Sequence, residues 1–192
     1  MLKIARFEVE GRIAHGVVEN GSVRGIQGDV FGEFTATGPS YPLDEIKLLT
    51  PTSPSKLLAV GLNYASHLGD TRTPEEPVIF LKSPSALLEP GGTIVLPREA
   101  KHVEHEGELV VVMGRRAHYV APEKALEYVL GYTCGNDVSA RPWQRNDLQW
   151  WRAKASDTFA PLGPYLATDI DPGNLDLEVR INGEVVQRGN TS

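Results

Sequence analysis

The stretch Lys101–Gly114, KHVEHEGELVVVMG, decides how the rest of the chain is interpreted, because it joins an acidic segment to an apolar one. Its apolar part, Leu109–Met113, predicts a strand that is buried on both faces and ends at Gly114. If that strand begins near His102, its side chains alternate between two faces. Gly107 then lies on one face, and the other face carries His102, Glu104, Glu106 and Glu108.

Carboxylates two positions apart on one strand face repel each other, and they lose hydration as the strand becomes buried. A hard divalent cation offsets both costs, because Mg²⁺, Mn²⁺ and Ca²⁺ take carboxylate oxygens as ligands. The alternative is a strand end whose glutamates lie in water, as most clusters of charge do. Both interpretations stay open from this segment alone.

Two further segments carry polar residues next to apolar runs. Val129–Gln144, VLGYTCGNDVSARPWQ, begins as a β-prone run, and Asp137 follows at its end, just before Arg141. An Asp at that strand end, opposite two strand-borne glutamates, would complete a site of three carboxylates. In Trp150–Pro164, WWRAKASDTFAPLGP, Lys154 lies between aromatic residues and a Ser-Asp-Thr turn.

These three segments, in this order, resemble the fumarylacetoacetate hydrolase family. The matching motifs in them are HEGELVVVMG, GNDVSARPWQ and WRAKASDTFAPLGP. Further matches are VGLNYASHLGD (Val60–Asp70), EEPVIFLKSPSALL (Glu75–Leu88) and VRINGEVVQRGNTS (Val179–Ser192). The resemblance runs from about Pro51 to Ser192, and the motifs in series carry more weight than any one of them alone.

Composition narrows the class of protein. The 192 residues suffice for one domain with a core and a small additional one. No run approaches the roughly 18 apolar residues of a membrane helix, and the N-terminus lacks the apolar core of a signal peptide. The formal net charge of −6, without a basic stripe, argues against nucleic-acid binding. The single cysteine, Cys134, excludes an internal disulfide, so we expect a cytoplasmic protein without a membrane partner.

The first 50 residues predict a small N-terminal β domain. Its expected strands form a meander: Leu2–Val9, Arg12–Val18 and Val23–Ile26. The turns between them are Glu10-Gly11 and Asn20-Gly21. Gln27–Pro42 lacks a helical period and predicts a loop. Because prolines bound segment 51–54, we interpret it as a linker and expect domains at residues 1–50 and 51–192.

Strand signals also dominate the larger domain. Apolar runs predict strands over Lys56–Val60 (buried, by its composition), Val78–Leu81, Thr93–Leu96, Leu175–Ile181 and Glu184–Gln187. Asn182-Gly183 is the strongest hairpin signal. Pro122–Leu130 is the best helix candidate, and Arg145–Trp151 predicts a short helix or an ordered loop.

We therefore expect a mainly β (α+β) fold, and the resemblance implies the mixed β-roll of the fumarylacetoacetate hydrolase family. Proteins of this family usually continue for several dozen residues beyond the position of Ser192. The resemblance therefore implies a catalytic domain that is incomplete, or truncated, at its C-terminal end. It also implies a homodimer that pairs through the large domains.

Upstream of the acidic segment, His67 and Asp70 are candidates for water activation. Asn63 could cap a short helix that begins at Tyr64, which would place His67 and Asp70 on one helical face. A carboxylate beside an imidazole raises its basicity, as a general base requires. The alternative is a surface helix on which the pair is incidental. The resemblance implies a mobile lid whose histidine and acid activate water, although the family's acid is more often Glu and Asp70 is shorter.

The resemblance also implies roles for the other site residues. Glu106, Glu108 and Asp137 would bind Mg²⁺ or Mn²⁺, and Lys154 would place a positive charge at a developing oxyanion. Residues that would bind substrate are Arg141, Gln144 and Thr191. An alternative for Arg141 is a structural partner of Asp137 or Asp147. Glu104 would support the metal ligands, Gly107 would remove packing on the far face, and Tyr64 would serve packing.

The expected substrate is a small-molecule 2-oxo acid. The resemblance implies hydrolytic cleavage of a C–C bond in an acylpyruvate-type 2,4-dioxo acid, such as fumarylpyruvate, by metal chelation and His67-activated water. The same site could isomerise a 2-hydroxyhepta-2,4-diene-1,7-dioate or decarboxylate oxaloacetate. A second alternative is a non-catalytic 2-oxo acid binder or an inactive fragment.

Overall fold

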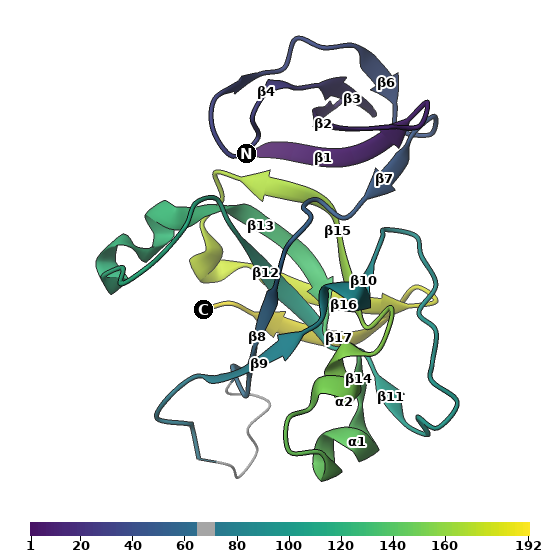
Figure 1. The fold of residues 1–192 in the computed structure, drawn as a ribbon, viewed down its shortest axis with the longest axis vertical. Coiled ribbons are helices and arrows are strands. Elements are labelled where there is room, and N and C mark those ends of the chain that lie inside the picture. The colour runs from purple at the N-terminus through teal and green to yellow at the C-terminus, as the bar shows by residue number, and fades with distance from the viewer. Residues whose placement is uncertain (65–71) are drawn as a thin grey trace.

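The computed structural model describes residues 1–64 and 72–192, and within them the chain is built mainly of strands (Figure 1). The strands are β1 (Leu2–Val9), β2 (Arg12–Glu19), β3 (Ser22–Gly25), β4 (Gln27–Gly28), β5 (Phe34–Thr35), β6 (Ser40–Pro42), β7 (Lys47–Leu49), β8 (Leu57–Gly61), β9 (Val78–Lys82), β10 (Leu87–Leu88), β11 (Val103–Glu104), β12 (Gly107–Met113), β13 (Val129–Asn136), β14 (Ser139–Ala140), β15 (Ala160–Thr168), β16 (Asp176–Ile181) and β17 (Glu184–Asn190). The helices are α1 (Arg141–Asn146) and α2 (Trp151–Ala155), with 3₁₀ turns at Pro84–Ala86, Pro122–Tyr128 and Pro172–Asn174. The expectation of a mainly β fold is confirmed.

One large sheet runs through the described part of the molecule. Its strand order is β12-β13-β15-β1-β2-β3-β6, with β10 also paired to β15 and β7 to β1. β1 pairs antiparallel with β15, so that Leu2 lies opposite Thr168 and Ile4 opposite Leu166. Figure 1 shows the N-terminal strands at one end of the molecule, next to β15. Residues 1–50 therefore extend a sheet whose other strands come from residues 51–192.

Tight turns set the register of the hairpins. Both residues have positive φ in the pairs Glu10-Gly11, Asn20-Gly21 and Asn182-Gly183. Two central residues with positive φ define the type I′ turn, and its backbone twist matches the twist of the two strands that it joins. The first two turns produce the predicted meander of β1, β2 and β3, and the third joins β16 to β17 as predicted.

The core spans the sheet. Ile4, Val30, Val112 and Leu166 form one buried cluster, which joins the N-terminal strands to β12 and β15. A second cluster, around Phe7, lies within the N-terminal strands, and a third lies beneath α1 and α2: Val138, Ala140 and Phe159. No helix in residues 1–64 or 72–192 is long and apolar enough to cross a membrane.

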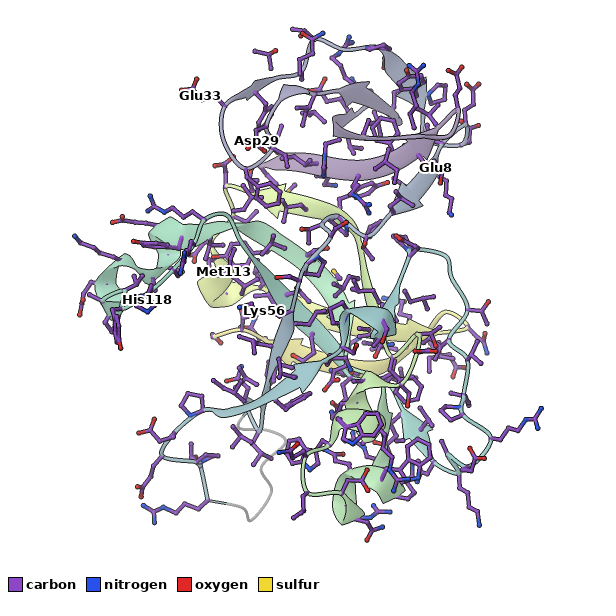
Figure 2. The ribbon with its side chains drawn as sticks, viewed as in Figure 1. Glu8, Asp29, Glu33, Lys56, Met113 and His118 are labelled. Atoms are coloured by element: carbon purple, nitrogen blue, oxygen red, sulfur yellow. The ribbon has the colours of Figure 1, made fainter. Side chains whose placement is uncertain are left out.

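Two strands are less buried than expected: Leu109–Met113, predicted to be buried on both faces, and Lys56–Val60, predicted to be buried by its composition. In β12 Val112 is buried, but Val111 and Met113 are 47% and 48% exposed (Met113 is labelled in Figure 2). In β8, Leu58 and Val60 are exposed, and they lie opposite the exposed Leu81 and Ile79 of β9. An apolar composition alone does not reveal whether a second layer covers a face.

Other segments differ from their predicted structure. Thr93–Leu96 forms no strand. The predicted helix Pro122–Leu130 is a 3₁₀ helix that ends at Tyr128, since Val129 begins β13, and Leu126 of its expected apolar face is exposed. The predicted loop Gln27–Pro42 contains three short strands, β4, β5 and β6, whereas Arg145–Trp151 agrees with its prediction, because most of it is an ordered loop between α1 and α2.

Candidate active site

A cavity of about 230 Å³ lies where several elements converge, and we call it the carboxylate cavity. It is lined by Glu106, Glu108 and Asp137 together with Arg141, Gln144 and Lys154. Residues from β8, β9 and the β16–β17 hairpin complete its wall. The structure thus brings six of the predicted site residues into one space.

Backbone pairing places Glu106 beside Asp137. In the antiparallel pair β12–β13, Gly107 lies opposite Asn136. Just beyond that ladder, the amide of Asp137 donates to the carbonyl of Glu106 at 2.8 Å, and the amide of Glu106 donates to Asn136 Oδ1 at 2.9 Å. A continuous strand from His102 was expected, but the chain leaves the ladder at residues 105–106. Before that break, the chain forms the separate short strand β11, which pairs with β14.

Lys154 of α2 is the central cation of the cavity. It is 2% exposed, and its Nζ lies 2.6 Å from Glu106 Oε2 and 2.5 Å from Asp137 Oδ2. The ammonium also lies 5.2 Å from the centroid of the Phe80 ring. Partial burial was expected from its aromatic neighbours in the sequence, and the observed burial is nearly complete. Its two anionic partners make such burial of a charge tolerable.

Lys82, at the end of β9, is a site residue that the sequence interpretation missed. It is 5% exposed, its Nζ lies 2.5 Å from Asp137 Oδ1, and it also donates to the backbone carbonyl of Lys154. Burial lowers the pKa of Lys82, and the Asp137 carboxylate opposes that effect. Strand alternation places Lys82 on the inward face with Phe80, and this signal could have found it.

Arg141, at the start of α1, forms ion pairs and a hydrogen bond with neighbouring side chains. Its guanidinium contacts Glu104 Oε2 at 2.6 Å and Glu106 Oε1 at 2.5 Å, and it donates to Gln144 Oε1 at 2.8 Å. Glu104 also contacts His102 at 2.6 Å, and hydrogen bonding from Arg141 lowers the pKa of Glu104. The alternative that paired Arg141 with Asp137 or Asp147 was therefore wrong about the partners, although a structural role is present.

The two glutamates of the cavity have opposite electrostatic surroundings. Burial would raise the pKa of Glu106, but Lys154 and Arg141 outweigh it, and the pKa falls to about 2. Burial and the charges of Asp137 and Glu106 raise the pKa of Glu108 to about 7. Among the described residues Glu108 has no cationic partner within ion-pair distance. Its negative charge is therefore the least compensated in the cavity.

Not every predicted site residue lies at the cavity. Thr191 Oγ1 donates to the carbonyl of Pro172 at 2.6 Å and accepts from the amide of Leu175 at 2.8 Å. In this structure it therefore connects the end of β17 to the turn at Pro172–Asn174, and it is not among the residues that line the cavity. His67 and Asp70 lie outside the described residues. Tyr64 lines the cavity, and burial and the charge of Glu108 raise its pKa.

The donor set fits a hard divalent cation. Three carboxylates line one cavity, and no cation in the described part of the chain lies within ion-pair distance of Glu108. As the side chains stand, no three His, Cys, Asp or Glu residues of the described chain surround a common metal position. Instead, Lys154 Nζ lies between oxygens of Glu106 and Asp137. Oxygen donors and spare negative charge match the preferences of Mg²⁺ and Mn²⁺.

The burial of Lys82 predicts a large loss of stability on its removal. Lys82→Met should lower the free energy of unfolding by about 3–5 kcal/mol, because Asp137 and the Lys154 carbonyl would lose a buried donor. Urea denaturation in the presence of a chelator measures this change. The matched control is Lys47→Met: Lys47 pairs with the exposed Glu8 (labelled in Figure 2) at 3.9 Å, and its loss should cost no more than about 1 kcal/mol. Equal losses in both variants would show that Lys82 does not stabilise the site.

Comparison with known protein families shows two matches, which together cover most of the chain. Residues 56–192 match the family described as Fumarylacetoacetate (FAA) hydrolase C-terminal, and residues 2–51 match the family described as Rv2993c-like, N-terminal. The chain belongs to the fumarylacetoacetate hydrolase family. The resemblance expected from the motifs is thereby confirmed.

Solved structures agree with this assignment. A 5-carboxymethyl-2-hydroxymuconate delta-isomerase from Mycobacterium smegmatis is 44% identical, with a TM-score of 0.90, over 98% of this chain and 75% of that one. A maleylpyruvate hydrolase from Sphingobium is 27% identical, with a TM-score of 0.77, over 98% of this chain and 77% of that one.

Among curated relatives, the mitochondrial oxaloacetate tautomerase of Rattus norvegicus is 44% identical over 161 residues. The match covers 80% of this chain and 51% of the rat protein. The chain thus spans about half the length of that relative and three quarters of the Mycobacterium smegmatis isomerase. These relatives are named as an isomerase, a tautomerase and a hydrolase.

Proposed function

We propose that this chain acts as a divalent-metal-dependent hydrolase that cleaves a C–C bond in an acylpyruvate-type 2,4-dioxo acid, such as fumarylpyruvate. One observation carries the proposal: three carboxylates and a fully buried lysine converge on one cavity of about 230 Å³. Glu106, Glu108 and Asp137 would hold Mg²⁺ or Mn²⁺. When bound, such a cation supplies a Lewis acid for the 2-oxo acid group.

The lysine has a defined part in this chemistry. Cleavage next to the distal carbonyl leaves an enolate of pyruvate, whose oxygen carries negative charge. Lys154 is held in place by Glu106 and Asp137 and points its ammonium into the cavity wall. A fixed ammonium in a buried site stabilises such an oxyanion more strongly than a solvated one does.

Water activation is assigned from the sequence. His67, supported by Asp70, would take a proton from water, and the resulting hydroxide would attack the distal carbonyl. The products are a carboxylic acid and pyruvate. Two ion pairs and the hydrogen bond to Gln144 occupy three donors of Arg141, so we propose that Arg141 and Gln144 orient the carboxylates around the substrate as well as contact it.

An isomerase or an oxaloacetate-converting enzyme is the alternative function. The names of the Mycobacterium smegmatis isomerase and of the rat oxaloacetate tautomerase favour it. Both reactions can use the same carboxylates and Lys154 without an activated water. The alternatives therefore differ in their need for His67 rather than in the metal site.

A substrate panel tests the proposal. We expect pyruvate release from fumarylpyruvate in Mg²⁺ or Mn²⁺, and loss of that release after treatment with a chelator. The same assay should include simple acylpyruvates, oxaloacetate and hydroxymuconate-type diacids. If the protein converts oxaloacetate or the diacid but cleaves no acylpyruvate, then the alternative function replaces the proposed hydrolysis. Binding of 2-oxo acids without turnover of any compound would indicate a non-catalytic binder.

A further inference from the structure

The side chain of Gln187 pairs with the backbone between two carboxylates of the cavity. The amide of Gly107 donates to Gln187 Oε1 at 2.9 Å, and Gln187 Nε2 donates to the carbonyl of Gly107 at 3.0 Å. Gly107 lies between Glu106 and Glu108 in the chain. The carboxamide therefore contacts both backbone hydrogen-bonding groups of the residue that spaces these two side chains.

Strand geometry explains why a side chain is needed there. The carbonyl of Glu106 faces β13, where it accepts from the amide of Asp137. Backbone groups of successive strand residues point to opposite edges, so those of Gly107 face away from β13. β12 is the edge of the large sheet in the described residues, and no strand of that sheet lies beyond it. Gln187 of β17 supplies the donor and acceptor that a neighbouring strand would supply.

Steric contact from the same hairpin requires glycine at position 107. A Cβ built on Gly107 would lie 2.3 Å from Val179 Cγ2 and 3.4 Å from Leu177 Cδ2. The first distance is far below any real contact, so an alanine would push β16 away from β12 or shift the backbone of β12. The expectation that Gly107 leaves the far face without packing was wrong, because Val179 fills that space.

The hairpin thus holds the acidic strand from its outer side. β13 fixes one edge of the Glu106–Glu108 backbone, and Gln187 and Val179 fix the other edge and the outer face. Leu177 and Gln187 also line the carboxylate cavity. We propose that Gln187 and Val179 are positioning residues that set the relative placement of the Glu106 and Glu108 carboxylates; this rests on the proposed metal site.

Two substitutions of Gln187 separate its hydrogen bonds. Gln187→Met removes both at similar length, whereas Gln187→Glu keeps the acceptor for the Gly107 amide and loses the donor to its carbonyl. We expect the affinity for Mn²⁺ alone, measured by calorimetry, to fall about 10–100-fold in the Met variant, as for other partners of metal ligands. The Glu variant should lose less affinity than the Met variant. Val186→Ala, at an exposed neighbouring position of β17, is the matched control.

A size exchange tests the steric part. Gly107→Ala should also weaken Mn²⁺ binding at least about tenfold, because it displaces the backbone of the two ligands. Adding Val179→Ala removes the methyl group that the new Cβ would strike and should restore most of the affinity. A residue that only stabilises the fold would lower the melting temperature without this pattern of loss and rescue.

Hydrogen exchange at the Gly107 amide provides a readout that needs no metal. Its exchange should accelerate at least about tenfold in Gln187→Met, because its acceptor is gone. Unchanged Mn²⁺ affinity in that variant, or a double variant no better than Gly107→Ala, would overturn the positioning role. A parent protein that binds no Mn²⁺ would overturn the proposed function instead. Even if the parent binds no Mn²⁺, slow exchange of the Gly107 amide in Gln187→Met would show that the hydrogen bond from Gly107 to Gln187 does not protect this amide.

Discussion

The Glu108→Gln protein is expected to keep its fold and to lose its response to Mg²⁺ and Mn²⁺. Glu108 has no cationic partner among the described residues, so the substitution breaks no ion pair there. Glutamine has the shape of the protonated carboxyl and lacks the charge that attracts the metal. The affinity for Mn²⁺ should fall by more than the roughly 10–100-fold that loss of a ligand's partner costs.

The same variant should gain stability at alkaline pH. The pKa of Glu108 is raised from 4.5 to about 7 in the folded protein, so folding disfavours its charged form. A raised carboxyl pKa contributes stability that is complete below pH 4.5 and is lost as the pH rises through about 7. In the presence of a chelator, the stability of Glu108→Gln should therefore exceed that of the parent above pH 7 and equal it near pH 4.

Two further variants check the assignment of Glu108. Glu106→Gln should destabilise the fold as well as weaken metal binding, because Lys154 and Arg141 would each lose an anionic partner. Glu127→Gln, which changes an exposed partner of Arg115 at 3.4 Å, should leave both properties nearly unchanged. Metal affinity that stays at the parent value in Glu108→Gln would remove Glu108 from the metal site.

The second large effect is expected at His67. His67→Ala should reduce the cleavage of an acylpyruvate by about 10²–10⁴, the usual contribution of one general base. Conversion of oxaloacetate, if the enzyme performs it, should fall far less, because it needs no activated water. Steady-state rates for both substrates at saturating Mg²⁺ measure the difference. His118→Ala is the control, because this exposed histidine (labelled in Figure 2) lies on the loop after β12.

The partner of the proposed base gives a pH signature. Asp70→Asn removes a negative charge that would raise the pKa of the His67 imidazole. The acidic limb of the pH profile should therefore move to lower pH, and the rate of cleavage should fall modestly. If His67→Ala reduces both reactions equally, then the role of His67 in water activation must be withdrawn.

Local chemistry made much of the site predictable. The alternation of residues in Lys101–Gly114 put its glutamates on one face, and the resemblance to the family then singled out Glu106, Glu108 and Asp137. The structure places all three at one cavity. Turn pairs such as Asn182-Gly183 marked their hairpins correctly, because two residues of positive φ are a strong local requirement.

The sequence by itself thus determined the family, the mainly β architecture and the acidic residues of the cavity, because each rests on a motif or a period within a short segment. Only the tertiary structure decided their partners: Lys82 reaches Asp137 across 55 residues, and Gln187 reaches Gly107 across 80. The burial of strand faces and the hydrogen bond from Thr191 to Pro172 were also decided by the tertiary structure. Such contacts depend on which strands pair and which layer covers them, and a local sequence pattern determines neither.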